Sequence, residues 1–247
     1  MIGAIVQARM GSTRLPGKVM MEAAGKPLLG HLLERLSYCR NLEKTVVATT
    51  TNERDDLIAD LCNSFGALVY RGSECDVLDR HYQAAKTFGI RCIVRVTSDC
   101  PLVDSELIDD KISCFMNKLD EYDLITNRHP LTYADGLDFD LIPLAALDIA
   151  WRTARAPHQR EHVVPFFWES EMRVHNFEDP RQLFYSNRWT LDYIEDYELI
   201  KSIYSALYKN GQRFTTKDIL TFLNANPQLS QINSKYLPHA ISQNSNQ

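Results

Sequence analysis

The pattern of apolar and polar positions changes about half-way along the chain. Up to about Lys118, short apolar runs typical of buried strands alternate with segments in which leucine and isoleucine recur at helical spacing. The predicted strands cover 2–6, 44–49, 67–70 and 91–96, and the predicted helices cover 28–36, 54–65, 75–88 and 103–115. Strands that alternate with helices in this way predict a parallel sheet with helices on both faces.

After Lys118 this regular alternation is lost, which indicates that antiparallel strands extend the sheet. Strands are predicted at 122–126, 137–142, 173–177 and 188–191, and helices at 144–155, 161–170 and 194–208. A short helix from Thr215 leads into a polar tail that we expect to be frayed after about Pro238. We therefore expect one α/β domain over 1–208 and a helical appendage with a polar tail over 209–247.

Composition excludes several classes of protein. The chain has 247 residues, of which 45% are hydrophobic and 24% charged, so it can bury a sizeable core without disulfides or a structural metal. The net charge of -5 argues against general nucleic-acid binding, and no apolar stretch is long enough to insert across a membrane. Six cysteines without a CxxC pair predict buried free thiols in a reducing compartment, so we expect a cytoplasmic protein.

Positive charge is concentrated in the loop after the first predicted strand. Residues 7–19 read QARMGSTRLPGKV, and Arg9, Arg14 and Lys18 stand there without a neutralising acid. Ligands of open α/β sheets gather beyond the carboxyl ends of the strands, where this loop is expected. Arginine forks and a mobile lysine suit the oxygens of a polyphosphate, although a solvated basic loop is the simpler alternative.

The spacing of this loop excludes two familiar phosphate-binding motifs. A Walker A loop has four residues between its glycines and a Ser or Thr after its lysine, whereas five residues separate Gly11 from Gly17 and Val19 follows Lys18. The dinucleotide fingerprint GxGxxG does not occur in the sequence either. A P-loop ATPase and a Rossmann dehydrogenase are therefore both poor fits.

Acidic residues are also expected at ligand-facing positions. Asp99 follows a strand rich in β-branched residues, and a carboxylate that faces a triphosphate needs a cation between them, typically Mg²⁺. A turn or helix cap is the alternative role for this residue. Asp138 and Asp140 are two apart on a predicted strand, so they share one face and could meet a cation or sugar hydroxyls, or simply face solvent.

Three arginines further along the chain are open to more than one interpretation. Arg71 follows a strand and could face a nucleotide or a sugar, whereas Arg80 lies well inside a predicted helix and fits an ion-pair partner better. Arg95 lies within an apolar strand, and a buried arginine needs a counter-charge from either a ligand or a protein carboxylate.

Residues 8–18, which read ARMGSTRLPGK, resemble the signature loop of the sugar cytidylyltransferases, with Ala8, Arg9, Gly11, Ser12, Arg14, Pro16, Gly17 and Lys18 at the motif positions. This family includes the synthetases of CMP-activated 3-deoxy-octulosonate and acylneuraminate and the spore-coat-polysaccharide type. The first loop is a highly specific motif, and the other motifs are moderately specific. The likeness to the spore-coat type extends over most of residues 1–205 and includes RGSECDVLDR at 71–80, VTSDCPLVD at 96–104, GLDFD at 136–140, REHVVPFF at 160–167 and LDYIEDYELI at 191–200.

The resemblance implies a three-layer α/β/α sandwich around a mostly parallel, twisted sheet of the nucleotide-diphospho-sugar transferase (GT-A-like) type. It implies an enzyme that activates a sugar, in particular an acidic one, with CTP to give a CMP-sugar and pyrophosphate for surface polysaccharide biosynthesis. It further implies a homodimer, in which a section at about 127–187 serves the sugar and the dimer contact.

The resemblance and the residue chemistry together give a set of candidate site residues. Arg14, Lys18 and Asp99 are expected to be catalytic. The resemblance implies that Asp99 and Asp192 bind Mg²⁺, whereas Asp196 fits a helix cap. The nucleotide is expected to contact Gln7, Ala8, Arg9, Gly11, Ser12, Arg14, Lys18, Arg71 and Thr97. The sugar is expected to contact Arg95, Asp138, Asp140, Glu161 and His162.

Several alternatives stay open on the sequence. His158 to His162 spells HxxEH, the inverted zinc-peptidase motif, but nothing else in the sequence supplies a zinc-protease context. A sugar-1-phosphate nucleotidyltransferase would use similar loops, and a GT-A glycosyltransferase would find its DxD motif in Asp138 and Asp140. A non-catalytic glycan-assembly protein would keep binding without turnover. The preference for CTP over other nucleotides rests on the resemblance.

Overall fold

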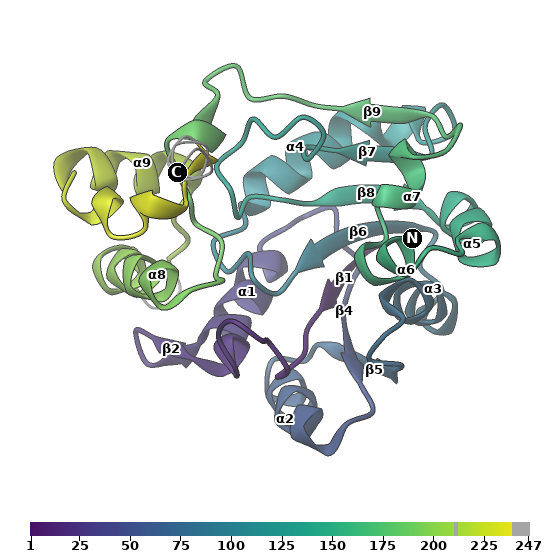
Figure 1. The fold of residues 1–247 in the computed structure, drawn as a ribbon, viewed down its shortest axis with the longest axis horizontal. Coiled ribbons are helices and arrows are strands. Elements are labelled where there is room, and N and C mark those ends of the chain that lie inside the picture. The colour runs from purple at the N-terminus through teal and green to yellow at the C-terminus, as the bar shows by residue number, and fades with distance from the viewer. Residues whose placement is uncertain (210–211, 239–247) are drawn as a thin grey trace, which may run out of the picture.

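A seven-stranded sheet runs through the middle of the computed structural model, which describes residues 1–209 and 212–238 (Figure 1). The strands stand in the order β5-β4-β1-β6-β8-β7-β9. Their bounds are β1 (Ile2–Gln7), β4 (Lys44–Thr50), β5 (Leu68–Gly72), β6 (Cys92–Thr97), β7 (Leu124–Thr126), β8 (Asp140–Pro143) and β9 (Val174–Asn176). The parallel pairs are β5 with β4, β4 with β1, and β1 with β6. Strand β8 is antiparallel to both β6 and β7, and β9 is parallel to β7. The predicted parallel sheet with an antiparallel extension is therefore confirmed.

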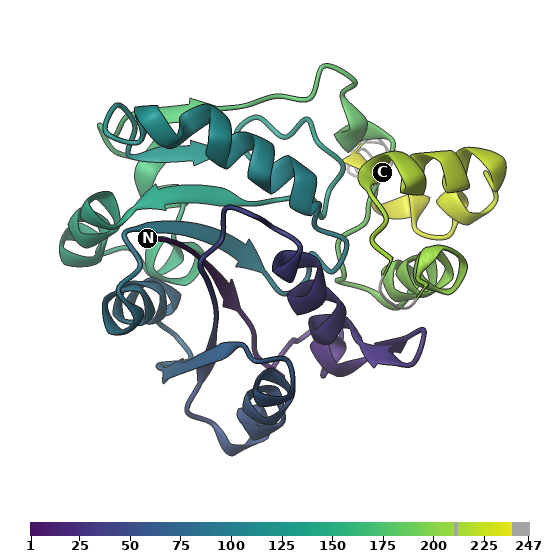
Figure 2. The same cartoon turned by 180° about the vertical axis from the view of Figure 1, so that it is seen from behind.

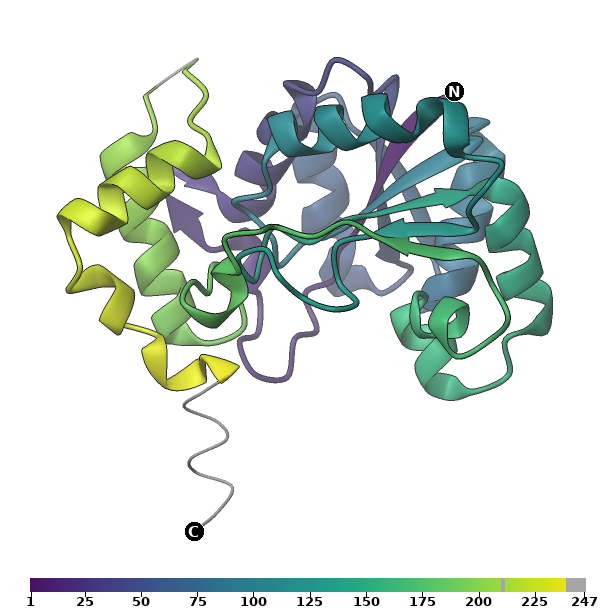
Figure 3. The ribbon, with the colours of Figure 1, turned by 90° about the horizontal axis from the view of Figure 1, so that it is seen from above.

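Helices cover both faces of this sheet (Figures 2 and 3). One face packs against α1 (Leu28–Ser37), α2 (Asp56–Ser64) and α4 (Ser105–Phe115), and the same core continues into α8 (Ile194–Leu207) and α9 (Thr216–Ala225), which lie beside the sheet. The other face packs against α3 (Val77–Phe88), α5 (Leu144–Thr153) and α7 (Pro165–Trp168), and α6 (Pro157–His162) contacts α3. Because successive strand residues point to opposite faces, Val6 lies in the first of these cores and Ile5 in the second. The expected three-layer sandwich is confirmed.

Local elements differ from the prediction mainly in the second half. The helix predicted at 161–170 is wrong: it is divided into α6 and α7, because Val163 has a φ of +68° and Pro165 cannot continue the hydrogen-bond ladder of a helix. The strand predicted at 137–142 begins only at Asp140. The strand predicted at 188–191 is also wrong, since among the described residues this segment makes one isolated bridge, between Arg188 and Asp135. A small hairpin, β2 (Glu22–Ala23) and β3 (Lys26–Pro27), was not predicted.

The thiols and the membrane prediction can also be compared with the structure. All six cysteines are free, but Cys75 and Cys114 are exposed, so the prediction of buried thiols is wrong for these two. No helix within residues 1–209 and 212–238 is long and apolar enough to cross a membrane. The tail predicted beyond Pro238 lies outside the described residues.

Candidate active site

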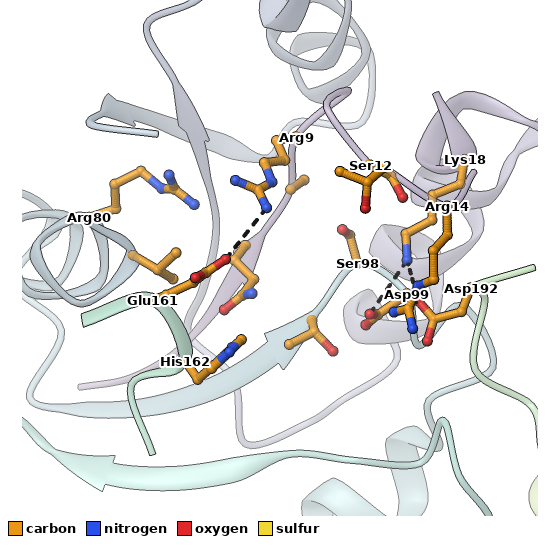
Figure 4. A pocket seen from close by; sticks show the side chains of 15 residues that line it. Arg9, Ser12, Arg14, Lys18, Arg80, Ser98, Asp99, Glu161, His162 and Asp192 are labelled. Atoms are coloured by element: carbon orange, nitrogen blue, oxygen red, sulfur yellow. Dashed lines mark hydrogen bonds and ion pairs between the residues drawn. The ribbon is translucent and has the colours of Figure 1, made fainter. Parts of the chain in front are cut away.

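A cavity of about 290 Å³ opens where the loops after β1 and β6 leave the sheet (Figure 4). Gln7 at the end of β1 is paired with Thr97 at the end of β6, so both loops start at the same edge. Glu161 and His162, which were predicted to contact the sugar, also line this cavity. The predicted nucleotide, catalytic and metal residues that line it are Gln7, Ala8, Arg9, Ser12, Arg14, Lys18, Thr97, Asp99 and Asp192.

Lys18 lies between two carboxylates at one end of this cavity. Its Nζ is 2.9 Å from Oδ1 of Asp192 and 3.6 Å from Oδ2 of Asp99, and it donates to the carbonyl oxygen of Leu191 at 2.5 Å. Burial by itself would raise the pKa of Asp99, but the charge of Lys18 and a hydrogen bond from Thr97 outweigh it and lower that pKa. Asp99 is therefore held ionised next to a cation.

The segment that carries Asp192 is attached to the loop of Asp99 by two hydrogen bonds. The backbone N–H of Leu191 donates to the carbonyl oxygen of Asp99 at 2.8 Å, and Oγ1 of Thr190 donates to the same oxygen at 3.2 Å. Gly136 lies so close to this segment that a Cβ atom there would come within 2.5 Å of the backbone nitrogen of Thr190. The chain crossing that brings Asp192 to Asp99 therefore requires a glycine at this position.

Arg188 orients the acidic residues around this crossing. Its guanidinium lies 2.7 Å from Asp135, 3.4 Å from Asp192 and 3.0 Å from Asp196. Asp196 is fully buried and accepts the backbone N–H groups of Asp192 and Tyr193, each at 3.0 Å, at the start of α8. The predicted helix-cap role of Asp196 is thus confirmed, and Arg188 and Asp196 together hold Asp192 toward the cavity.

The residues around Lys18 fit a magnesium ion that is bound jointly with a nucleotide. Within residues 1–209 and 212–238, no group of three or more His, Cys, Asp and Glu side chains could hold a metal on its own. Asp99 and Asp192, however, already share one cation, the ammonium of Lys18. Two carboxylates are what Mg²⁺ typically takes from a protein when phosphate oxygens and water supply its other ligands.

The opposite end of the cavity is lined by Arg9, Arg80 and Glu161 (Figure 4). Arg9 lies 3.8 Å from both Glu74 and Glu161, so protein carboxylates partly balance its charge. Arg80 was expected to be an ion-pair partner, and this expectation is wrong for the part of the chain that the structure describes. Its Nη1 donates instead to the carbonyl oxygens of Ser73 and Glu74, at 2.5 and 3.1 Å.

A second cavity of about 360 Å³ shares a wall with the first. Both cavities are lined by Gln7, Thr97, Asp99, His162 and Asp192. A molecule in the second cavity would therefore meet a molecule in the first across the two candidate metal ligands.

The second cavity also contains residues that the sequence analysis did not assign. Arg128, Asp135 and Trp168 line it together with the predicted Arg95 and Asp138. Arg128 follows closely on the end of β7, and Asp135 immediately precedes the GLDFD motif. In the sequence, the position of Arg128 after a strand and the position of Asp135 next to a family motif were the features that could have marked them as candidate site residues.

Asp138 faces the second cavity with one unpaired oxygen. Its Oδ1 is buried without a hydrogen-bond partner, and its Oδ2 lies 3.8 Å from Nε of Arg128. Burial is the main cause that raises the pKa of Asp138, to about 6, and the nearby charges of Asp140 and Asp99 act in the same direction against Arg128. Ionisation of this carboxyl group is therefore unfavourable in the site, and a hydrogen-bond donor from a ligand would stabilise the ionised form.

Three predicted residues do not line either cavity. The guanidinium of Arg71 is used by the carbonyl oxygens of Thr50 and Asn52 and by Asp56 at 2.6 Å, so its assignment to the nucleotide is corrected. Gly11 lies beside the guanidinium of Arg54, outside the lining of the first cavity.

Asp140 is likewise directed into the protein. It is fully buried, lies 2.9 Å from Nη1 of Arg95 and accepts the hydroxyl of Thr126 at 2.6 Å. The prediction that it shares a ligand-binding face with Asp138 is therefore wrong, and Arg95 finds its counter-charge in the protein.

The HxxEH segment does not form a metal centre. His158 contacts Glu169 at 2.8 Å, whereas His162 faces the two cavities and Glu161 faces Arg9. The three side chains thus have separate partners, and the zinc-peptidase alternative finds no support in the described residues.

A family model described as "Cytidylyltransferase" matches residues 3–219 of the chain. This chain belongs to the cytidylyltransferase family. The match includes the loop of Lys18, the loop of Asp99 and the crossing at Asp192, so the family relationship extends over the whole candidate site.

Individual relatives agree with this membership. The cytidylyltransferase-family chain is 34% identical over 232 residues to the spore coat polysaccharide biosynthesis protein SpsF of Bacillus subtilis, covering 90% of this chain and 94% of that protein. A solved cytidylyltransferase structure from Leptospira borgpetersenii serovar Hardjo-bovis is similar with a TM-score of 0.88 and 36% identity, covering 93% of this chain and 96% of that one. The 3-deoxy-manno-octulosonate cytidylyltransferase of Geobacter sulfurreducens is 39% identical over 114 residues, 45% of this chain and 44% of that protein.

Proposed function

We propose that this cytidylyltransferase-family chain transfers the cytidylyl group of CTP to a hydroxyl group of a sugar and releases pyrophosphate, in the synthesis of a surface polysaccharide. The observation that carries the proposal is the wall between the two cavities. Asp99 and Asp192 line both of them, with Lys18 between the carboxylates. Two substrates that fill the cavities would meet at these residues.

In the proposed reaction, the sugar hydroxyl forms a bond to the α-phosphorus while the bond from that phosphorus to the bridging oxygen of the β-phosphate breaks. Magnesium, bound by Asp99 and Asp192, would neutralise charge on the α-phosphate. The proton of the hydroxyl passes to water during the attack, and pyrophosphate leaves with the electron pair of the broken bond.

The loop after β1 provides the groups that hold the triphosphate. Arg14 is 53% exposed and lies 2.9 Å from Asp192, so it can turn to the β- and γ-phosphates without loss of a buried contact. Lys18 can follow when a metal takes its place between the two aspartates. Ser12 and Arg9 line the cavity along its length. Catalysis in this arrangement consists of positioning and charge stabilisation, with no covalent enzyme intermediate.

We assign the sugar to the second cavity and expect it to be acidic. Arg128 offers a guanidinium there for a sugar carboxylate, and Asp138 offers an unpaired oxygen for a hydroxyl group. The activity named for the Geobacter relative, on 3-deoxy-manno-octulosonate, supports an acidic sugar. A sugar 1-phosphate would bring a dianion toward Asp99, Asp135 and Asp138, which makes that nucleophile less suitable.

Two further features belong to this proposal. We infer a homodimer that uses the section at about 127–187, where Ile149 is exposed. We also infer a cytoplasmic enzyme, because six unpaired cysteines, four of them buried, suit a reducing compartment.

The experiment is a measurement of pyrophosphate release with each of the four nucleoside triphosphates against a panel of acidic sugars, neutral sugars and sugar 1-phosphates, with magnesium present. We expect release with CTP and an acidic sugar, and its loss in the Asp99→Asn variant. Release with a sugar 1-phosphate alone, or no release with any pair, would refute the proposed function.

A further inference from the structure

Arg80 is a buried cation that the protein itself leaves incompletely paired. The side chain is 2% exposed, and it lies on α3 facing the first cavity. Within the described residues, both of its hydrogen bonds start at Nη1 and end on carbonyl oxygens, those of Ser73 and Glu74. Its Nε is buried without a partner. A buried guanidinium that has neither a carboxylate nor a full set of acceptors is costly unless a ligand completes it.

Its electrostatic surroundings agree with this interpretation. Burial is the main cause that lowers the pKa of Arg80, and the neighbouring charge of Arg9 lowers it further, although the carboxylates of Asp55, Glu74 and Asp76 act in the opposite direction. The carbonyl oxygens of Ser73 and Glu74 hold one edge of the guanidinium in place. Nη2 makes no hydrogen bond within the described residues, so its N–H donors remain available to a ligand.

The position of Arg80 in the cavity indicates which part of a nucleotide it would meet. Figure 4 shows Arg80 across the cavity from Lys18, Asp99 and Asp192. If the α-phosphate lies at the two aspartates, as the proposed function requires, the phosphates occupy the Lys18 end and the base extends toward α3. Ser12, Arg14 and Lys18 already supply donors to the phosphates at their end.

We propose that Arg80 recognises the pyrimidine edge of the nucleotide and makes the cavity selective for cytosine. Cytosine presents two adjacent acceptors, O2 and N3, to the donors of a guanidinium. Uracil carries a hydrogen atom on N3, which would point at those donors and leave them without an acceptor. A site built to donate hydrogen bonds discriminates strongly against a ligand that cannot accept them. This inference rests on the proposed function for the direction in which the nucleotide lies.

The test measures the affinities of CMP and UMP by calorimetry for the wild-type chain and for Arg80→Gln and Arg80→Lys. We expect wild type to prefer CMP over UMP. Arg80→Gln should lose on the order of 10- to 100-fold in CMP affinity, as expected for lost charge-assisted hydrogen bonds, and most of the preference over UMP. Arg80→Lys, which keeps the charge but not the guanidinium plane, should also lose the preference.

Arg160→Gln is the matched control for loop damage. Arg160 contacts Asp76, close to Ser73 and Glu74, at 2.5 Å, but it does not line the first cavity. This variant should disturb the same loop and keep the preference for CMP. Equal losses of CMP and UMP affinity in the Arg80 variants, or loss of the preference in Arg160→Gln, would overturn the inference.

The binding experiment separates this inference from the proposed reaction. A wild-type chain that selects CMP through Arg80 and yet releases no pyrophosphate with any sugar would refute the transfer reaction and leave the inference intact. A chain that releases pyrophosphate but binds CMP and UMP equally well would do the reverse.

Discussion

The ammonium group of Lys18 lies 2.9 Å from the carboxylate of Asp192, although the two residues belong to opposite ends of the domain. Because Asp99 is only 3.6 Å from the same nitrogen, Lys18 occupies the position between the two carboxylates where a divalent cation would bind. In the proposed reaction a metal would compete with this lysine for the same pair of aspartates, and binding of the metal would turn Lys18 toward the phosphates.

Replacement of Lys18 by Met should expose this competition. The variant removes the cation that Asp99 and Asp192 share, so added magnesium should raise its melting temperature more than that of wild type, while nucleotidyl transfer falls on the order of 10²- to 10³-fold. Differential scanning fluorimetry across magnesium concentrations measures the first effect. Lys26→Met is the control, since Lys26 pairs with Glu34 at 2.8 Å, away from both cavities. Equal magnesium responses in all three proteins would contradict the competition.

Asp138 should make the stability of the fold depend on pH. Its pKa is raised to about 6 in the folded state, so between about pH 4 and 6 the unfolded chain loses this proton before the folded chain does. The free energy of unfolding therefore falls as pH rises through this window. Asp138→Asn removes the penalty, and its stability relative to wild type should increase with pH by on the order of 1–3 kcal/mol.

Asp179 provides the control of opposite sign for this pH series. Burial tends to raise the pKa of Asp179, but hydrogen bonds from Arg181 outweigh it, and the pKa is lowered. Asp179→Asn should be less stable than wild type near neutrality, and this deficit should shrink as pH falls toward and below the ordinary aspartate range. Chemical denaturation at a series of pH values measures both variants. If the difference in the free energy of unfolding between Asp138→Asn and wild type did not change with pH, the pKa of Asp138 would not be raised in the folded state.

Arg188 should be important for both stability and the position of Asp192. Arg188→Met leaves Asp135, Asp192 and Asp196 without their common cation, and breaking a buried pair of this kind costs about 3–5 kcal/mol. An exposed ion pair serves as the comparison: Arg173, which is 57% exposed and contacts Asp123 at 2.8 Å, should contribute less than about 1 kcal/mol. Urea denaturation of Arg188→Met and Arg173→Met tests the contrast, and equal losses would contradict it.

Gly136 should tolerate no side chain. Its φ of +106° and the contact of 2.5 Å that a Cβ would make with backbone at Thr190 predict that Gly136→Ala loses several kcal/mol or fails to fold. Gly25→Ala separates the two causes, because Gly25 also has a positive φ, of +75°, but among the described residues no atom lies within 4 Å of the place that a Cβ would take. That variant should lose only about 1–2 kcal/mol. Thermal unfolding of both variants measures the difference, and similar melting temperatures would argue against a tight crossing.

The gathering of residues at the Lys18 end of the first cavity was predictable because these residues follow strand ends. Arg9, Arg14 and Lys18 lie on one loop, and Asp99 lies on the loop of the neighbouring strand, so parallel pairing alone brings them to one edge. The position of Asp192 could not be derived in this way. It depends on a chain crossing without regular strand structure, and only the family resemblance indicated it.

Roles that depend on which side of an element faces a cavity were not predictable from local pattern. Arg71 follows a strand like a ligand residue, but its donors are taken by Asp56 and two carbonyl groups nearby. Arg80 looks like an ordinary helical arginine in the sequence, and only the packing of α3 turns it into the first cavity without a carboxylate partner among the described residues. Competition between protein partners and ligands for the same donors is decided by tertiary structure.

In the proposed reaction, a sugar hydroxyl attacks the α-phosphorus of CTP at the wall formed by Asp99 and Asp192. The most direct test follows the phosphorus label when CTP carrying ³²P at either the α- or the γ-position reacts with the acidic sugar that supports the fastest pyrophosphate release. The label of α-labelled CTP should appear in a cytidine-containing sugar product, and the label of γ-labelled CTP should appear only in pyrophosphate. Transfer of the γ-label to the sugar, or no label on the sugar from either CTP, would contradict this reaction.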